Sequence, residues 1–427
     1  MRLRTTEVRL SEDGDRVSEN WRKAGWAGAA IGVIAAGAAA GVAVERITVG
    51  RGIRRKARLA LDAAGDYGSL RGAEGVCLAE DGTELYYEVD ELPEEPGRRG
   101  RLRRKKPPAA TVVFCHGYCL GQDSWHFQRA ALRGTVRAVY WDQRSHGRSM
   151  RGLSQADGEP VTIELLGRDL KAVIDATTPE GPLVLVGHSM GGMTIMALAE
   201  QFPELVRERV LGVALVGTSS GRLDEVTYGL PALGMGAVRR LLPGVLRVLG
   251  SQVELVERGR RATADLFAGM IKQYSFGSRE VDPGVARFAE RLIEATPIDV
   301  VAEFYPAFQV HDKSIALQRF TDIPVTVIAG DHDMITPPEH SAAIKDVLPA
   351  AELVVLEDTG HLMMLERPDE VTALLTGLLA RTGAVPQALS ADGPGDASGA
   401  VSAGGSGATN VGAHGRSTAR SAAQPGS

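Results

Sequence analysis

The sequence predicts an α/β protein with a mostly parallel, doubly wound sheet and a helical lid inserted between two of its strands. Three observations carry this prediction. From residue 110 onward, short apolar runs alternate with amphipathic stretches, the order expected of strand–helix units. The apolar runs are continuous rather than alternating, as in strands that a sheet buries on both faces. Residues 221–320, mostly helical in pattern, then separate two of the predicted strands.

Composition limits the class of protein further. The chain has 427 residues, of which 44% are hydrophobic, and this is enough for a sizeable core. Its formal net charge of −5 excludes a globally basic nucleic-acid binder, and a mean hydropathy of −0.06 excludes a protein with many membrane spans. Three cysteines are too few for a disulfide scaffold.

The N-terminal part of the chain contains one candidate membrane segment. Residues 1–23 are polar, whereas residues 24–44 are 21 residues without a charge, a length that fits one bilayer crossing. Small residues four positions apart, such as Gly28 and Gly32, suit close helix packing in a membrane. We therefore expect a single transmembrane helix over 24–44. A signal peptide and a soluble alanine-rich helix are the alternatives.

The charges that flank this segment predict its orientation. Six basic residues follow it closely and four precede it, so the positive-inside rule places its C-terminal side in the cytoplasm. We expect a single-pass, membrane-anchored protein, with residues 45–75 as a basic linker or helix and the main domain on the cytoplasmic side. Export of the chain is the alternative.

The main domain is expected over residues 76–383 and begins with a hairpin. Strand-like runs within 76–90 flank Asp81-Gly82, a pair typical of hairpin turns. A basic loop, 91–109, follows, and seven of its nine residues 98–106 are Lys or Arg. We expect a solvated insertion, with contact to anionic lipid headgroups as the alternative. No aromatic residues interleave with this run, which argues against nucleic-acid binding.

The rest of the domain alternates predicted strands with predicted helices. Apolar runs predict strands at 111–115, 136–141, 183–186, 210–216, 323–329 and 353–356. Helical spacing predicts helices at 163–176, 190–201 and 369–381. The lid is expected at about 221–320. Residues 384–427 are rich in Ala, Gly and Ser and are expected to be a disordered tail.

A strand, a tight turn and a helix meet at a G-x-S-x-G motif. Gly187, Ser189 and Gly191 form the motif between the run that starts at 183 and the helical pattern that starts at 190. A nucleophilic serine on such a strained turn needs glycine on both sides, because neighbouring backbone passes close by. Ser189 is therefore the candidate nucleophile; a serine that only caps the helix is the alternative.

Two further residue types needed for nucleophilic catalysis follow later in the chain. A serine needs a base, and the base needs an orienting carboxylate. Asp333 lies just after the predicted strand 323–329, and His361 lies in the loop after the next strand. We expect Asp333 rather than its neighbour Asp331 to be the carboxylate and His361 to be the base.

Two backbone N–H groups are also needed to bind a developing oxyanion. One is expected from Met190, which follows the nucleophile. The other is expected from Tyr118, in the loop after the strand 111–115, where Gly117 permits a turn. His116 in the same loop is expected to be a structural histidine bonded to the loop backbone.

These motifs together resemble the α/β-hydrolase superfamily, within its lid-bearing branch of esterases and enzymes similar to monoacylglycerol lipase. The resemblance covers about residues 76–383 and rests on His116-Gly117, Asp142 to Ser149, Gly187 to Gly192, Gly330-x-x-Asp333 and Gly360-His361. It implies the α/β-hydrolase fold, and it implies that Asp142 and Arg144 are structural. The family's common form has Gly where Ser145 stands. Its dehalogenases and epoxide hydrolases use an Asp nucleophile, so Ser189 argues against those activities.

The expected function is a serine hydrolase that cleaves a carboxylic ester, or a related acyl bond, through an acyl-enzyme. The catalytic residues are Ser189, Asp333 and His361, the oxyanion donors are Tyr118 and Met190, and neither a metal nor an organic cofactor is needed. The expected partner is a small ester or lipid-like substrate, with membrane association and without nucleic acid. Perhydrolase, haloperoxidase-like or C–C hydrolase chemistry with the same triad is one alternative, and a ligand sensor with little turnover is another.

Overall fold

The computed structural model describes residues 66–93, 109–223, 226, 244, 274–278 and 280–385. Several predicted segments lie outside these residues. They are the polar segment 1–23, the candidate transmembrane segment 24–44, most of the linker 45–75, the basic run 98–106, part of the insertion 221–320 and nearly all of the tail 384–427.

The prediction of a single-pass, membrane-anchored protein is corrected. Within the part of the chain that the structure describes, no helix has both the length and the apolar character needed to cross a bilayer. Segment 24–44, on which the prediction depended, lies outside that part. Its residues are mostly Ala and Gly, which gain little from transfer into lipid, so its lack of charge was weak evidence for a membrane helix.

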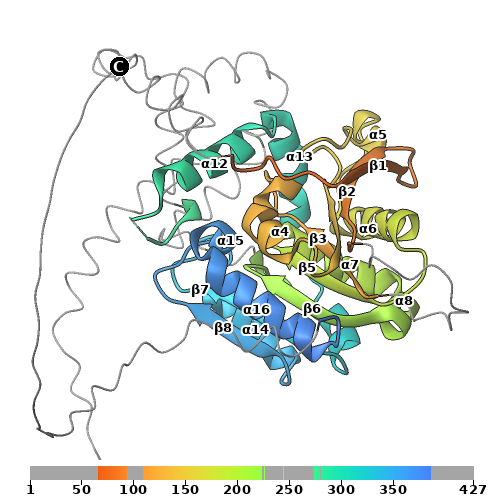
Figure 1. Cartoon of the computed structure of the whole chain (residues 1–427). Helices are drawn as coiled ribbons and strands as arrows, with labels where there is room; N and C mark the ends of the chain where they lie inside the picture. Colours follow the sequence, from red (N-terminus) through yellow and green to blue (C-terminus); the bar gives the residue numbers. More distant parts are fainter. Residues whose placement is uncertain are drawn as a thin grey trace, which may run out of the picture. The chain divides into compact units, whose positions relative to one another are not determined.

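One eight-stranded sheet organises the described residues (Figure 1). From one edge to the other its strands are β1 (Ala73–Leu78), β2 (Glu84–Asp90), β4 (Arg137–Trp141), β3 (Thr111–Cys115), β5 (Leu183–His188), β6 (Val210–Val216), β7 (Val325–Gly330) and β8 (Glu352–Leu356). Strands β1 and β2 pair antiparallel, and β2 pairs antiparallel with β4. The six strands from β4 to β8 in this spatial order are parallel.

The sheet confirms the predicted fold class and most strand positions. The hairpin turns at Asp81-Gly82, and Gly82 has a φ of +82°, which glycine adopts without strain. Strand β1 begins three residues before the expected domain start at 76. Every residue of β3 and β5 is buried, as continuous apolar runs predict. Cys115 and Gly187 lie opposite each other, so the loops after β3 and β5 leave the same edge of the sheet.

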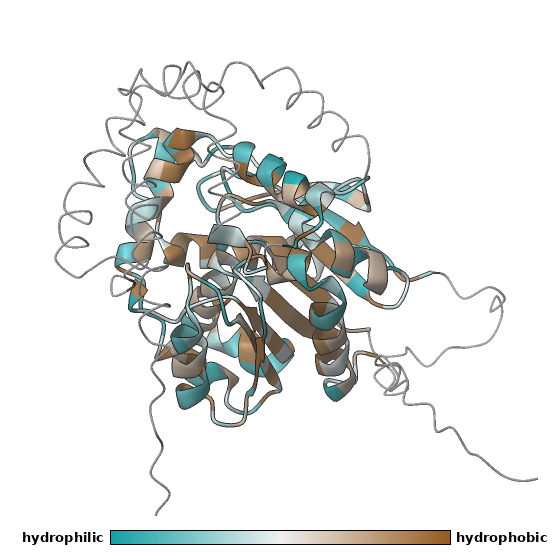
Figure 2. Ribbon diagram, turned by 90° about the vertical axis from the view of Figure 1, so that its left-hand side faces the viewer, coloured by the Kyte–Doolittle hydropathy of each residue, from teal (hydrophilic) through white to brown (hydrophobic). Residues whose placement is uncertain are grey.

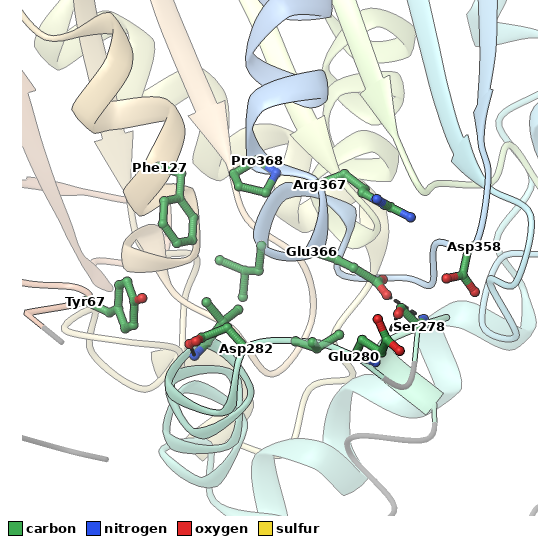
Figure 3. A pocket seen from close by; sticks show the side chains of 12 residues that line it. Tyr67, Phe127, Ser278, Glu280, Asp282, Asp358, Glu366, Arg367 and Pro368 are labelled. Carbon is green, nitrogen blue, oxygen red and sulfur yellow. Dashed lines mark hydrogen bonds between the residues drawn. The ribbon is translucent and has the colours of Figure 1, made fainter. Parts of the chain in front are cut away.

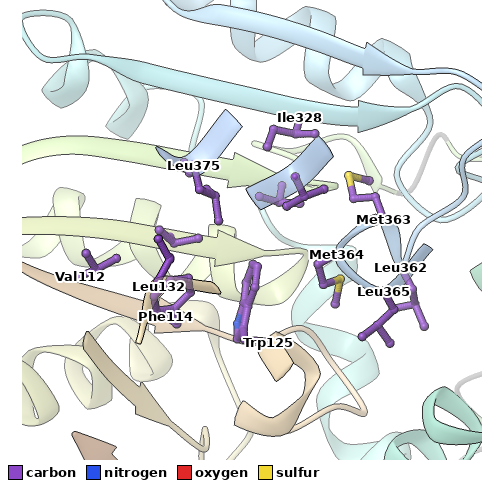
Figure 4. Packing of buried hydrophobic residues seen from close by; sticks show 14 of the residues in the cluster. Val112, Phe114, Trp125, Leu132, Ile328, Leu362, Met363, Met364, Leu365 and Leu375 are labelled. Atoms are coloured by element: carbon purple, nitrogen blue, oxygen red, sulfur yellow. The ribbon is translucent and has the colours of Figure 1, made fainter. Parts of the chain in front are cut away.

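Two apolar layers cover the faces of the sheet. Alternate residues of β3 show the division, because Val112 and Phe114 belong to one buried cluster and Val113 and Cys115 to the other. The first cluster contains side chains of α4 (His126–Leu132), α12 (Pro283–Glu294), α15 (Met363–Glu366) and α16 (Pro368–Arg381); the second contains those of α6 (Ile163–Thr177), α7 (Met190–Gln201), α8 (Pro203–Arg209) and α14 (Pro338–Val347). Figure 4 shows part of the first cluster, around Trp125 and the side chains of α15.

Hydropathy follows the same division. In Figure 2 the central strands are hydrophobic, whereas the helices that flank them also carry hydrophilic residues. The predicted helices at 163–176, 190–201 and 369–381 are confirmed as α6, α7 and α16. Thr162 caps α6, because its side chain accepts the N–H of Leu165. The sequence did not predict α4, α8, α14 or α15.

The described part of the insertion between β6 and β7 is helical, as its pattern predicts. It contains α12, α13 (Ile298–Gln309) and the 3₁₀ helix η4 (Ala316–Phe320). Asp282 caps α12 by accepting two backbone N–H groups. The two ends of the insertion meet where Gly221 and Asp312 form an antiparallel bridge.

The loop after β4 is a structural element, as the resemblance implies. The side chain of Arg144 is fully buried and forms two bonds of 2.6 Å to Asp169, and it also pairs with Asp81 at 2.8 Å. Asp142 accepts the backbone N–H groups of Gln122 and Arg148. These buried bonds tie the loop after β4 to the hairpin turn, to α6 and to the loop after β3.

Candidate active site

Ser189 stands on a strained turn between β5 and α7. It is the N-cap of α7, its φ is +51° and its ψ is −119°, and only 7% of its surface is exposed. Such a backbone conformation is costly for a residue with a Cβ, and surrounding contacts must hold it. A Cβ on Gly191 would lie 2.2 Å from the carbonyl oxygen of Cys115, and one on Gly187 would lie 2.6 Å from Gly191. Both flanking glycines are therefore required by packing.

Asp333 and His361 form a buried pair at the ends of neighbouring strands. Asp333 follows β7 and His361 follows β8, and the two side chains are 28 residues apart in sequence. The distance from His361 Nδ1 to Asp333 Oδ2 is 2.8 Å. A carboxylate accepts hydrogen bonds, so the hydrogen of this imidazole lies on Nδ1 and its Nε2 is free to act as a base.

The carboxylate of Asp333 is held by several donors. Its Oδ1 accepts the N–H groups of Ile335 and Thr336 at 2.8 and 2.9 Å. Its Oδ2 accepts the Thr336 hydroxyl at 2.9 Å in addition to His361. These bonds fix the plane of the carboxylate and, with it, the orientation of the imidazole.

Asp331, the rival carboxylate, has a different role. Its Oδ1 accepts the N–H of Thr359 at 3.0 Å, and about a third of its side chain is exposed (35%). It therefore braces the loop that carries His361, whereas Asp333 contacts the imidazole itself.

Ser189 is next in sequence to a residue that contacts His361. The ring of His188, its neighbour in sequence, packs on the ring of His361 with 4.7 Å between ring centroids. Within the described residues, the Ser189 hydroxyl makes no hydrogen bond to His361. Asp333 thus bonds His361 directly. Ser189 is linked to His361 by the ring contact of its neighbour His188.

The predicted oxyanion donors belong to two segments that meet at Ser189, the start of α7 and the loop after β3. Met190 follows it at the start of α7, and the loop of Tyr118 approaches it because a Cβ on Gly117 would lie 3.2 Å from the Cβ of Ser189. Neither the Tyr118 N–H nor the Met190 N–H donates to another group in the described ranges. An oxyanion site needs two backbone N–H groups that are not used elsewhere.

The side chain of Tyr118 reaches the insertion. Its hydroxyl donates to the carbonyl of Val301 in α13, and its ring stacks on Phe304 and contacts Phe308 edge-on. Arg151 pairs with Asp299 and Glu303 of the same helix. Helix α13 is therefore fastened to the loops after β3 and β4.

His116 is a structural histidine, as predicted. Its Nδ1 lies 2.7 Å from the carbonyl of Gly117, and its Nε2 accepts the N–H of Gln143 at 2.9 Å. Burial lowers its pKa to about 4, so the ring is neutral near pH 7. Both ring nitrogens are occupied, which leaves none for catalysis.

Three residues that contact the site were not predicted from the sequence: His188, Thr336 and Glu366. His188 fills the variable position of the G-x-S-x-G motif, and its Nε2 lies 2.9 Å from the carbonyl of His361. Glu366 accepts the N–H groups of Gly277, Ser278 and Gly360. His188 precedes Ser189 and Thr336 follows Asp333 by three residues, so nearness in sequence could have indicated these two, whereas Glu366 is the last residue of α15.

A cavity of about 500 Å³ lies next to Glu366 but contains none of the predicted catalytic residues. Figure 3 shows it between α4, α12 and α15, the short helix that ends at Glu366. Its lining combines apolar side chains such as Tyr67 and Phe127 with carboxylates such as Asp282 and Asp358. In the part of the chain described, no group of three or more His, Cys, Asp and Glu residues could hold a metal ion.

Comparison with known proteins agrees with the fold. The family model described as alpha/beta hydrolase fold matches residues 110–368, and the chain belongs to this family. The sn-1-specific diacylglycerol lipase ABHD11 of Mus musculus is 27% identical over 63% of this chain and 80% of the relative.

Two further similar proteins have names that indicate other reactions, acetyl transfer and lactone hydrolysis. The dihydrolipoyllysine-residue acetyltransferase component of the acetoin cleaving system of Cupriavidus necator is 28% identical over 65% of this chain. The match spans 66% of that protein's own length, just under two thirds. The crystal structure of an enol-lactonase from Burkholderia xenovorans superimposes with a TM-score of 0.53 and 25% identity, over 72% of this chain and 100% of that one.

Proposed function

We propose that the protein is a serine hydrolase that cleaves a carboxylic ester through a covalent acyl-enzyme. The single observation that carries the proposal is the buried Asp333–His361 pair, whose imidazole packs on the residue next to a serine on a strained strand-to-helix turn. This combination of nucleophile, base and orienting carboxylate is needed for acyl transfer by serine. Relatives named as a lipase and a lactonase also support an ester substrate.

In the proposed mechanism, the Ser189 hydroxyl attacks the ester carbonyl while His361 Nε2 takes its proton. Asp333 keeps the hydrogen of the imidazole on Nδ1 and stabilises the imidazolium that forms. The N–H groups of Tyr118 and Met190 bind the oxyanion of the tetrahedral intermediate. His361 then returns the proton to the leaving alcohol. In the second half, His361 activates a water molecule that hydrolyses the acyl-enzyme and regenerates Ser189.

We further propose that residues 76–383 form the catalytic unit and that the insertion at about 221–320 acts as its lid. The contacts of Tyr118 with α13 support this, because they connect the insertion to the oxyanion loop. The apolar cluster that includes Met190, Met193 and Phe304 favours an apolar acyl or alkyl group.

Active-site labelling and ester turnover test the proposed function. We expect a fluorophosphonate probe to label the full chain and p-nitrophenyl esters of some acyl length to be hydrolysed. Ser189→Ala should lose both, whereas Ser69→Ala, at an exposed serine, should keep both. Wild-type protein that neither reacts with the probe nor hydrolyses any ester of an acyl-length series would refute the proposal.

The same assay separates the alternatives. Peroxide-dependent bromination in acetate buffer that exceeds ester hydrolysis and depends on Ser189 would favour perhydrolase or haloperoxidase-like chemistry. Turnover of a carbon–carbon substrate in place of esters would favour a C–C hydrolase. Tight ligand binding without labelling or turnover would favour a sensor.

A further inference from the structure

We propose that His188 is a positioning residue, which fixes the main chain of His361 relative to the nucleophile turn. The inference depends on the proposed function, since it concerns how the base is held beside Ser189. Its starting point is a hydrogen bond between the two histidines, which are 173 residues apart in sequence. His188 is the residue directly before Ser189, so this bond connects the turn of the nucleophile to the loop of the base.

The chemistry of the acceptor fixes the tautomer of His188. Its Nε2 lies 2.9 Å from the carbonyl oxygen of His361, and a carbonyl accepts but does not donate. The hydrogen of the neutral His188 ring must therefore lie on Nε2. The side chain is almost fully buried, with 1% of its surface exposed. Its Nδ1 is also buried and has no hydrogen-bond partner among the described residues.

The packing around the ring holds it in this orientation. A Cβ on Gly117 would lie 2.6 Å from His188 Nδ1 and 3.0 Å from Cε1, so glycine is required there for the ring to fit. Trp125 meets the ring edge-on at 6.4 Å between centroids, and the His361 ring packs on it at 4.7 Å. With the ring confined in this way, its Nε2–H stays directed at the His361 carbonyl.

His361 is consequently held at both its side chain and its main chain. Asp333 bonds its Nδ1 and sets how the imidazole is turned. His188 bonds its carbonyl and sets where its backbone lies relative to Ser189. Both constraints are needed to place Nε2 near the serine hydroxyl, and a misplacement of about 1 Å can cost a factor of about 100 in rate. A carbonyl left without its donor in a buried site also loses a stabilising bond.

A pair of substitutions separates this role from simple packing. The amide of Gln places an N–H close to the position of histidine Nε2, whereas the shorter Asn places its amide near the position of Nδ1. We expect His188→Gln to keep kcat within about fivefold of wild type and His188→Asn to lower kcat by about 100-fold, with KM changed little in both. The free energy of unfolding is measured for both variants, so that activity is compared between folded proteins.

A third variant tests the same contact without altering His188. Gly117→Ala directs a methyl group at the His188 ring and should lower kcat in the wild-type chain. The same change should lower kcat less in the His188→Ala background, because alanine has no atom at the ring positions Nδ1 and Cε1 that the methyl group would meet. This non-additivity is the signature of two residues that act through one contact.

The outcomes that overturn the proposal differ from those that overturn the function. Equal kcat in wild type, His188→Gln and His188→Asn, with Ser189→Ala inactive, would refute the role of His188 and keep the serine hydrolase. Equal loss of kcat in both His188 variants, or failure of both to fold, would assign His188 to core packing and also refute it. Absence of labelling and turnover in the wild type would remove the proposed function and this inference with it.

Discussion

Glu366 accepts the backbone N–H of Gly360 at 2.7 Å, directly before the candidate base His361. The same carboxylate accepts the N–H groups of Gly277 at 3.2 Å and Ser278 at 2.7 Å. Figure 3 shows Glu366 beside Ser278. One side chain therefore joins residues 277–278 of the insertion, which precede α12, to the loop of the base. In addition, the N–H of Leu362 donates to the carbonyl of Ser275 at 2.9 Å.

Replacing this carboxylate should affect both stability and activity. Glu366→Gln leaves one carbonyl oxygen for three N–H donors, and its amide N–H₂ would face at least one of the three. We expect a loss of about 1–3 kcal/mol in the free energy of unfolding, measured in urea, together with a lower kcat. Glu357→Gln, at an exposed position in the same loop, is the control. Equal stability of the two variants would contradict the role of Glu366.

Asp333 and Asp331 offer a matched test of the orienting carboxylate. Asp333→Asn keeps the shape of the side chain but favours the wrong imidazole tautomer, so kcat should fall by about 10⁴-fold. Asp331→Asn alters bonds to the loop backbone and none to the imidazole of His361, so kcat should stay within about tenfold of wild type. The measurement is kcat for the best ester found in the acyl-length series. A larger loss in Asp331→Asn than in Asp333→Asn would reverse the assignment.

Tyr118→Phe tests how the insertion is fastened to the oxyanion loop. The change removes the hydroxyl that donates to the Val301 carbonyl but leaves the backbone N–H of residue 118 in place. We expect a loss of about 0.5–1.5 kcal/mol in the free energy of unfolding. KM should rise by about two- to tenfold, with kcat within about threefold of wild type, as for a contact outside the reacting atoms. A kcat loss as large as that of Ser189→Ala would argue against this separation.

Buried histidines predict that the protein loses stability in mild acid. Burial lowers the pKa of His116 to about 4 and that of His146 to about 3, and it also lowers the pKa of His188 well below its ordinary value. The unfolded chain takes up protons at these sites near pH 6.5, whereas the folded chain does not. Stability is therefore complete above about pH 6.5 and falls as the pH decreases toward the folded pKa values, by about 1.4 kcal/mol per pH unit for each histidine.

Urea unfolding between about pH 7 and pH 5 measures this slope. His146→Gln should reduce the slope by about one proton, because one buried histidine is removed. His332→Gln is the control, since 54% of the His332 side chain is exposed. A free energy of unfolding that stays constant over this range would contradict the prediction.

Much of the fold could be predicted because the sheet imposes a simple pattern on the sequence. Strands buried on both faces require continuous apolar runs, and β3 and β6 have the predicted boundaries. The candidate catalytic residues could be located because each of them follows a strand, and parallel strands end at one edge of the sheet. Long amphipathic helices such as α6 could also be predicted, because their apolar residues recur with helical spacing.

The unpredicted elements depend on contacts between distant residues. Helix α15 has only four residues and is held by packing of its Met and Leu side chains, since so short a helix has little stability of its own. The bonds of Glu366 to Ser278 and of His188 to His361 link residues 88 and 173 positions apart. No local pattern indicates such bonds, because they exist only once the sheet has brought the loops together.

The bridge between Gly221 and Asp312 means that the insertion can be replaced without changing the sheet. The N–H of Lys313 also donates to the carbonyl of Ser220 at 2.6 Å, so the insertion leaves and rejoins the sheet at one narrow neck between the adjacent strands β6 and β7. A segment attached through a neck can be exchanged as a cassette without altering the order of the strands. Grafting experiments that swap the segment between 222 and 311 therefore have two natural splice points here.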